Sequence, residues 1–267
     1  PKIKRSISPL GLLLASVSAI IGSGWLFSAF YTSTIAGPAA LISWLIGGVG
    51  IIIVAFVFAE ICTLIPVTGS STRIPQFTHG TFISFLFSWM IWLSYAALAP
   101  TEVQAVTQYS SYFWPQLTSS SGELTHIGFV FALVLMLFVS IINTYSLKWL
   151  IKSNNFITFL KVLIPLVLIA FIFMHNHSLK TALSQGFAPM HMHGILGALS
   201  TGGIVFAFHG FKQAAEMAGE AKRPHIALPV AIIGSVILCL ILFLLLQLAF
   251  MASLTPSNIS HGWSHLE

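Results

Sequence analysis

Two apolar stretches of this sequence are interrupted by glycines near their middles, at a depth where a membrane offers the backbone no water. The first interruption is Ile21 to Gly24, and the second is Phe206 to Gly210. An interrupted helix leaves carbonyl acceptors at the end of its first half and N–H donors at the start of its second half. Such backbone is tolerated in a bilayer only where it is buried in protein or lines a cavity. The glycines therefore predict a binding site built from backbone groups.

Opposite helix directions would give this site two kinds of polar group. With the N-terminus on the inner side, the half-helix after the first interruption begins at mid-membrane with free amides, which favour an anion. The predicted donors are the amides of Gly22, Ser23 and Gly24, next to Ile21, and the Ser23 hydroxyl. The second helix runs the other way, and we expect its first half to end around Val205 to Ala207, just before Phe208, with carbonyls that suit an ammonium group. A carboxylate acceptor beside an ammonium acceptor fits the backbone of an α-amino acid.

Each glycine motif also has a second interpretation, as a close contact between helices, because small residues are common at helix interfaces in membranes. Glycine-interrupted spans in corresponding halves of a chain are typical of a transporter's binding site. Two interruptions at these positions therefore favour the site.

Two charged residues lie within apolar stretches, where a charge at the bilayer centre costs about 2.5–3.5 kcal/mol and usually faces a cavity or a partner. Lys161 lies about 10 Å past the inner boundary of its stretch, at 1.5 Å per residue. It either exchanges protons, since burial disfavours a charged amine, or extends its side chain back to the headgroups. Glu102 lies in the outer half of its stretch and could contact the substrate side chain, carry a proton, or pair with another helix.

The composition is that of a membrane protein. Of the 267 residues, 57% are hydrophobic and 6% are charged, and there is no aspartate; soluble domains average about 25% charged residues. Because a span needs about 20 mostly apolar residues, seven spans are predicted. Their ranges are 9–33, 39–65, 82–113, 125–146, 154–175, 192–217 and 226–253. The third is longer than one membrane thickness, so it is strongly tilted or begins with an interfacial turn around Phe77 to Phe82.

Lysine and arginine predict the orientation, because cytoplasmic loops carry an excess of both. With the N-terminus inside, Lys180 falls in an outer loop, and Lys161 and Lys212 fall within spans. The inner loops then hold Lys2, Lys4, Arg5, Arg73, Lys148, Lys152, Lys222 and Arg223. We therefore expect a multi-pass protein of the plasma or inner membrane with a cytoplasmic N-terminus.

Several motifs resemble the amino acid–polyamine–organocation superfamily, in its bacterial amino acid permease type. Ile21-Gly22-Ser23-Gly24-Trp25-Leu26-Phe27 is similar to its first-helix motif, and Ala59-Glu60 with Pro66-x-x-Gly69 to the end of its second helix. The segment Phe206-Ala207-Phe208-x-Gly210-Phe211, followed by Glu220-x-Lys222-Arg223-Pro224 and Pro229, is similar to its sixth-helix signature and the loop beyond. The resemblance extends through all seven spans.

This resemblance implies an all-α fold, a five-plus-five inverted repeat usually within twelve spans, that works by alternating access. Residues 1–267 would form one transmembrane domain, with 9–175 as the first repeat and 192–253 as the incomplete start of the second, so we expect a fragment of a longer chain. By position, Gly22, Ser23 and Gly24 would hold the substrate carboxylate, and Phe206 would be the aromatic gate. Lys161-x-x-x-Pro165 resembles the segment in which proton-coupled relatives place a lysine where sodium-coupled relatives bind sodium.

The sequence departs from the family pattern at two places. After the second predicted span it reads Gly69-Ser70-Ser71-Thr72-Arg73, where relatives often have paired glycines and a tyrosine. Lys212 stands where an acidic residue is common, which argues against a basic substrate, because a cation near the route repels another.

The leading hypothesis is therefore a secondary transporter of amino acids that is coupled to protons, with an amino acid or amine exchanger of the same fold as the alternative. A seven-helix receptor is disfavoured by the predicted inner N-terminus and by the lack of a lysine in 226–253. An enzyme is disfavoured because neither His-Glu-x-x-His nor Gly-x-Ser-x-Gly occurs. We expect an amino acid substrate and a surrounding lipid bilayer as partners, no nucleic acid, no metal, and no cofactor beyond the coupling proton.

Overall fold

The computed structural model describes residues 5–22, 24–119, 122–145, 147–175 and 186–253, and these ranges are almost entirely helical, without a β-strand. The first half of the chain contains α1 (Pro9–Ile20), α2 (Gly24–Ala36), η1 (Gly37–Ala39), α3 (Ala40–Leu64), α4 (Ser70–Ser110), η2 (Pro115–Leu117) and α5 (His126–Tyr145). The second half contains α6 (Leu147–Met174), α8 (His191–Ser200), α9 (Ile204–Ala207), η4 (His209–Phe211), α10 (Lys212–Glu216), η5 (Ala218–Glu220) and α11 (Pro224–Ser253).

Several of these helical stretches have the length and apolar character of membrane spans, which confirms the predicted all-α membrane class. Five described stretches are long enough to cross a bilayer, and they are Phe27–Leu64, Ser70–Ser110, Phe156–Met174, His191–Glu216 and Pro224–Ser253. Two shorter apolar helices are Pro9–Ile20 and His126–Ile142. Phe27–Leu64 covers the end of the first predicted span and most of the second, Ser70–Ser110 begins before the third, and each of the other segments overlaps a single predicted span. The count of seven stays a prediction, because the two shorter helices do not reach the length of a span by themselves.

Local sequence signals explain where the first helices begin and turn. The Ser8 hydroxyl accepts a hydrogen bond from the Gly11 amide at 3.1 Å, and Pro9 occupies the first turn, so α1 has a regular N-terminal cap. Gly37 has a φ of +60°, a conformation that glycine adopts without strain, and it separates α2 from α3. The chain therefore reverses between the first and second predicted spans.

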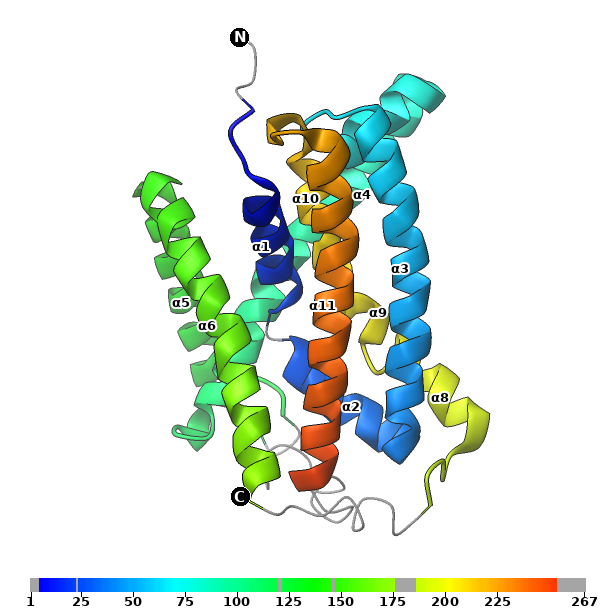
Figure 1. Cartoon of the computed structure of the whole chain (residues 1–267). Helices are drawn as coiled ribbons and strands as arrows, with labels where there is room; N and C mark the ends of the chain where they lie inside the picture. Colours follow the sequence, from blue (N-terminus) through cyan, green and yellow to red (C-terminus); the bar gives the residue numbers. More distant parts are fainter. Residues whose placement is uncertain (1–4, 23, 120–121, 146, 176–185, 254–267) are drawn as a thin grey trace.

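A kink divides α4 and settles how the third predicted span begins. Gly80 has φ +82° and ψ 179° inside the helix, so a short segment from Ser70 precedes a long one that ends at Ser110. The short segment folds away from the bundle at the top of Figure 1. Of the two alternatives for this span, the structure therefore favours the turn around Phe77 to Phe82, although the span ends three residues before the predicted residue 113.

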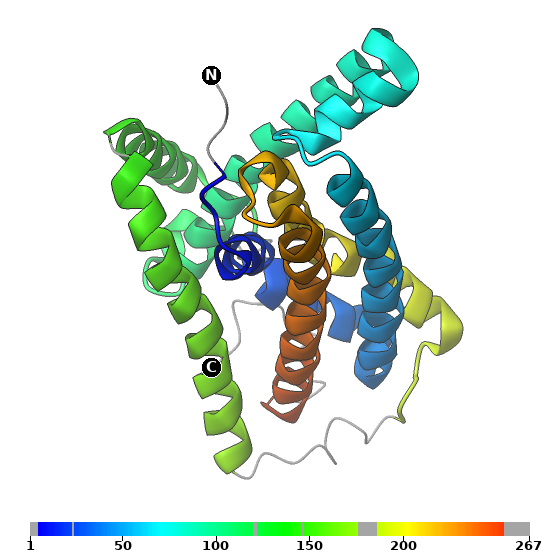
Figure 2. The same cartoon turned by 45° about the horizontal axis from the view of Figure 1, so that its top comes forward.

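The long helix α11 is the centre of the bundle. It packs against α1, α2, α3 and α6, and in Figures 1 and 2 the α5–α6 pair and α3 lie on opposite sides of it. Its inward face meets the largest buried side chains, among which Trp44 and Phe208 both pack against Phe243. The core therefore joins α3, α11 and the segment after α9.

Backbone hydrogen bonds tie together three segments at the end of the bundle where α1 begins. The amides of Ser6 and Ile7 both donate to the Glu220 carbonyl at 3.0 Å, and the Lys222 amide donates to the Ile7 carbonyl at 2.9 Å. From the α3–α4 loop, the Gly69 amide donates to the Glu216 carbonyl at 2.8 Å. We call residues 5–8 the N-terminal arm. The arm and the α3–α4 loop are therefore both hydrogen-bonded to residues 216–222, which follow the sixth-helix interruption.

Candidate functional site

The first predicted interruption is present between α1 and α2. The first half-helix ends at Ile20, and Ile21 leaves the helical conformation with φ −82° and ψ 79°. The second half-helix begins at Gly24. Ser23 lies outside the described residues, so its predicted contacts are not placed. The chain thus has two helix ends facing each other across Gly22, one with carbonyls and one with amides.

The interruption in the sixth predicted span is longer and begins earlier than expected. Helix α8 ends at Ser200, and Gly203 follows with a φ of +78°. Ile204 to Ala207 then form the single turn α9. The prediction that the first half ends at Val205 to Ala207 is therefore wrong. The cause is the pair Gly202–Gly203, because a glycine in the left-handed region is a common end of a helix.

The two interrupted helices lie directly against each other. A Cβ on Gly210 would overlap the backbone of Ala19 and Ile20, so only glycine permits this contact. On the other side of the interruption, a Cβ on Gly203 would lie 3.0 Å from the Ser28 hydroxyl oxygen. The interruption of the first helix is therefore flanked by contacts to the interrupted sixth helix on both sides.

A buried serine joins α1 to the second half of the sixth helix. The Ser16 hydroxyl oxygen accepts a hydrogen bond from the Ala214 amide at 3.0 Å and lies 3.4 Å from the Phe211 carbonyl, to which it donates. Ser16 is fully buried. This side chain completes backbone hydrogen bonding at the start of α10, where a helix leaves amides without partners of its own.

The residues predicted to contact substrate from the sixth helix divide into two groups. Val205 and Phe206 are 50% and 56% exposed, whereas Ala207 and Phe208 are buried. The Phe208 ring packs edge-on against Trp44 with centroids 5.9 Å apart, so its side chain belongs to the core. The Phe206 ring lies parallel to that of His209, with centroids 6.3 Å apart. Substrate contact by these residues, and the gate role of Phe206, stay predictions.

Glu102 on α4 lies at the first interruption. A Cβ on Gly22 would be 2.5 Å from the Glu102 Oε1 atom, so the glycine leaves room for the carboxylate. This carboxylate interacts electrostatically with Lys161 on α6 and with Tyr109. Tyr109 in turn stacks on Phe27 of α2, with centroids 5.1 Å apart. The structure therefore brings Glu102, Gly22 and Lys161, which the sequence singled out separately, into one region.

Lys161 contacts the first half of the first helix. Its Nζ atom donates a hydrogen bond to the Ser18 carbonyl at 3.0 Å, and its side chain is half-buried. Ser18 lies in the last turn of α1, where carbonyls lack helical partners and the helix dipole favours a cation. The position of this ammonium group is therefore set by the interruption itself.

The sequence analysis missed a polar pair on the sixth helix. Lys212 Nζ donates to His209 Nε2 over 2.7 Å, and Glu216 one turn later also interacts electrostatically with Lys212. An ammonium group can only donate, so the histidine nitrogen must accept. The spacing of these three residues, at i, i+3 and i+7, places them on one helix face, and that spacing could have revealed the pair.

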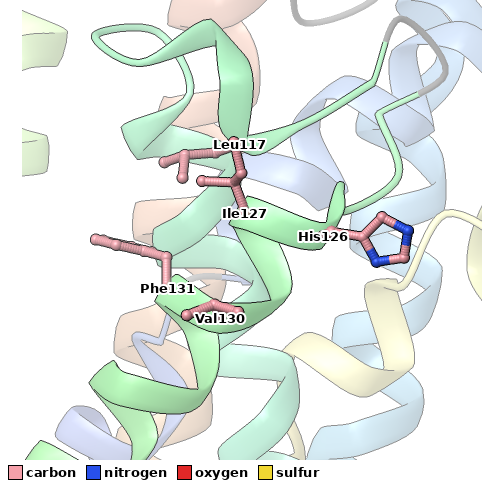
Figure 3. A pocket seen from close by; sticks show the side chains of 5 residues that line it. All are labelled: Leu117, His126, Ile127, Val130 and Phe131. Carbon is pink, nitrogen blue, oxygen red and sulfur yellow. The ribbon is translucent and has the colours of Figure 1, made fainter.

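A separate hollow of about 440 Å³ lies between η2 and the start of α5. Figure 3 shows its lining, which consists of Leu117, His126, Ile127, Val130 and Phe131. The lining is apolar except for His126, and a site that orients a polar ligand has several convergent polar groups. Within the part of the chain that the structure describes, no group of three or more His, Cys, Asp or Glu residues is placed to hold a metal ion.

Comparisons with known proteins identify the family of this chain. The model of the family described as amino acid permease matches residues 7–265. The glutamate/serine transporter AimA of Bacillus subtilis (strain 168) is 38% identical over 272 residues, which cover 99% of this chain and 50% of that protein. The aspartate-proton symporter of the same organism is 33% identical over 261 residues, covering 97% of this chain and 50% of that protein.

This chain therefore spans about half the length of these two curated relatives. The family and these relatives are permeases or transporters and not enzymes. With its helices of membrane-spanning length, the chain is that of a multi-pass membrane protein. It belongs to the amino acid permease family of the amino acid–polyamine–organocation superfamily.

Proposed function

We propose that the protein moves amino acids across a membrane by alternating access and couples this movement to protons. The observation that carries the proposal is the meeting of the two interrupted helices, with Glu102 at Gly22 and Lys161 on the Ser18 carbonyl. The amides of Gly22, Ser23 and Gly24, between α1 and the first residue of α2, would bind the substrate carboxylate. The Gly22 amide, which donates to the Ile20 carbonyl at 3.0 Å, would exchange that hydrogen bond for one to the substrate. Carbonyls of the sixth-helix interruption would bind its ammonium group.

Lys161 supplies a route for coupling. A hydrogen bond from a charged ammonium is roughly twice as strong as one between neutral groups. Protonation of Lys161 therefore strengthens the attachment of α6 to the last turn of α1, and loss of the proton weakens it. The Ser18 carbonyl, which accepts this hydrogen bond, lies in the last turn of α1, next to the residues that would hold the substrate. The proton and the substrate would therefore both act on the C-terminal end of α1.

Glu102 adds a second group that can carry a proton. Its carboxylate lies beside the amides that would bind the substrate carboxylate, and two carboxylates sharing one site cannot both be charged without a large penalty. Substrate binding is therefore expected to require that Glu102 be protonated or move away from Gly22. Either event links the charge state of the site to its occupancy.

The proposed substrate class follows from charge and from the relatives. Lys212 and Lys161 place positive charge near the route, which disfavours a basic side chain. The names of the two relatives mention glutamate, serine and aspartate. We propose that these amino acids are the first to test, that the N-terminus is cytoplasmic, and that the location is the plasma or inner membrane.

The direct test is uptake of radiolabelled amino acids by the complete protein in liposomes, with and without an imposed pH gradient. We expect uptake of at least one α-amino acid, stimulated by an inwardly directed proton gradient. Uptake only against a preloaded amino acid, with no effect of the gradient, would show an exchanger in place of a symporter. Absence of uptake for every amino acid in a folded protein would contradict the function.

Replacing Lys161 tests the proton route. In Lys161→Ala the contact with the Ser18 carbonyl is lost, so uptake should no longer respond to the pH gradient, although substrate exchange can persist. The matched control is Lys222→Ala, which removes an exposed lysine side chain and should leave the response intact. A Lys161→Ala protein with unchanged proton dependence refutes the assignment.

Replacing Glu102 by its neutral isostere tests the second proton carrier. Glu102→Gln keeps the side-chain shape at Gly22 and removes both the charge and the ability to carry a proton, so the pH profile of uptake should change. Glu123→Gln, an exposed change after η2, is the control. A pH profile identical to that of the unmodified protein would leave Glu102 with a structural role only.

A further inference from the structure

A buried amide on α11 connects three helices. Gln247 is 0% exposed. Its Oε1 atom accepts a hydrogen bond from Trp44 Nε1 of α3 at 3.0 Å, and its Nε2 atom donates to the Ser33 hydroxyl of α2 at 2.7 Å. The Thr32 hydroxyl of α2 lies 3.0 Å from the same Oε1 atom and 2.6 Å from the Ser28 carbonyl. Because an indole nitrogen can only donate, Trp44 fixes which end of the amide is oxygen.

The partners of Gln247 also touch the interrupted sixth helix. A Cβ on Gly202 would lie 2.7 Å from the Thr32 methyl carbon. The Trp44 ring packs edge-on against Phe208, which directly follows α9. Gln247 is therefore connected to the interrupted segment at two places, through Thr32 to Gly202 near its start and through Trp44 to Phe208 after α9.

The same network sets the position of α2. Thr32 and Ser33 lie in the helix that begins at Gly24, and both are buried. A short helix can be displaced along or around its axis unless other helices hold it. Satisfied buried polar networks favour one arrangement over others, because a displaced arrangement leaves polar groups without partners in an apolar environment.

We propose that Gln247 is a positioning residue, which fixes α2 against the sixth-helix interruption and so aims the amides at the start of α2 into the site. This role rests on the proposed function, because those amides would hold the substrate carboxylate. The hydrogen bonds of the Gln247 side chain go to Trp44, Thr32 and Ser33, and we assign none of these three residues to substrate contact. Gln247 acts on binding through them.

The test compares Gln247→Leu with Ser235→Ala in the complete protein. Leucine retains the approximate volume of glutamine but leaves the Trp44 indole without its acceptor. Ser235 is also fully buried on α11, but its hydroxyl donates to the Ile232 carbonyl of the same helix. We expect KM for uptake to rise about 10-fold in Gln247→Leu, because the substitution removes all three hydrogen bonds of the Gln247 side chain and leaves the buried Trp44 donor without an acceptor, with a smaller change in maximal rate. Ser235→Ala should leave KM unchanged.

A milder variant covers the case in which Gln247→Leu does not fold. Trp44→Phe keeps an aromatic ring against Phe208, removes the indole donor together with part of the ring volume, and leaves the Gln247 hydrogen bonds to α2 in place, so KM should rise by a smaller factor. If KM is unchanged in folded Gln247→Leu, or in folded Trp44→Phe where the leucine variant fails, the positioning role is overturned.

A local reporter separates this inference from the proposed function. Ser28 is buried on α2 and faces Gly203, so a Ser28→Cys thiol should react slowly with a water-soluble maleimide. Adding Gln247→Leu should speed the reaction about 10-fold, because α2 then loses its hydrogen bonds to α11 and the thiol becomes more accessible. Adding Ser235→Ala should leave the rate unchanged. If the parent protein takes up no amino acid, the proposed function fails, and this reaction still decides the positioning role: an unchanged rate overturns it.

Discussion

The interruption of the first helix and that of the sixth differ in length and in what their glycines do. The first runs only from Ile21 to Ser23, between two regular half-helices. The second extends from Thr201 to Phe211 through the single turn α9 and the 3-10 turn η4. In the first, Gly22 leaves room for a carboxylate from α4, whereas in the second, Gly210 allows the backbone of α1 to approach.

This difference in length indicates that the two interruptions have different roles. A short gap keeps two helix ends close together, so that their backbone groups can act on one ligand. A long gap made of short turns exposes some side chains, such as Phe206, and buries others, such as Phe208. The first interruption therefore contains the amides proposed for the substrate carboxylate, and the second, besides the carbonyls proposed for the ammonium group, contains the packing surface that holds the first in place.

The largest effect is expected from Gly210→Ala. The new methyl group would overlap the backbone of Ala19 and Ile20, which cannot move aside as a flexible side chain can. Overpacking of this kind costs about 1–3 kcal/mol or more, so the thermal midpoint in detergent and the uptake should both fall. Gly50→Ala is the control, because a Cβ there meets nothing within 4 Å. Equal stability of the two variants would show that this packing surface is not needed.

Gly22→Ala should separate stability from transport. Its methyl group would meet the Glu102 carboxylate, the far end of a flexible side chain, so the side chain can swing away at little cost in folding. We expect a thermal midpoint near that of the unmodified protein and a marked loss of pH-dependent uptake. A fall in stability as large as that of Gly210→Ala would mean that the two glycines have the same role.

The smallest effect is expected from Ser16→Ala, which removes one bridge between the two helices. The Ala214 amide loses its acceptor, and a single lost hydrogen bond of this kind costs about 1 kcal/mol. Differential scanning fluorimetry should therefore show a modest drop in thermal midpoint. Ser140→Ala, at an exposed serine that bonds within α5, should show none; equal values for both would remove Ser16 from the packing surface.

The sequence was sufficient for features that depend on local composition. The apolar stretches and the interruption after Ile20 follow from hydropathy and glycine. The predicted start of the second interruption is wrong because Gly202–Gly203 ends the first half of that helix before the aromatic segment around Phe206 begins.

Contacts between distant parts of the chain could not be predicted in this way. The depth of Lys161 follows from counting residues, but its acceptor, the Ser18 carbonyl, depends on how α6 packs against α1. The network of Gln247 with Thr32 and Trp44 joins residues more than 200 positions apart. Such contacts depend on the rotation of each helix about its axis, which one sequence does not encode as a visible pattern.

The hydrogen bonds between the N-terminal arm and the segment from Glu220 to Lys222 have a mechanical consequence. Together with Ser16, they join the first half of the first helix to the second half of the sixth at both ends of their contact. These two half-helices are therefore expected to move as one rigid body during any rearrangement, with the two interruptions as hinges. A rearrangement that separated them would first have to break all of these hydrogen bonds.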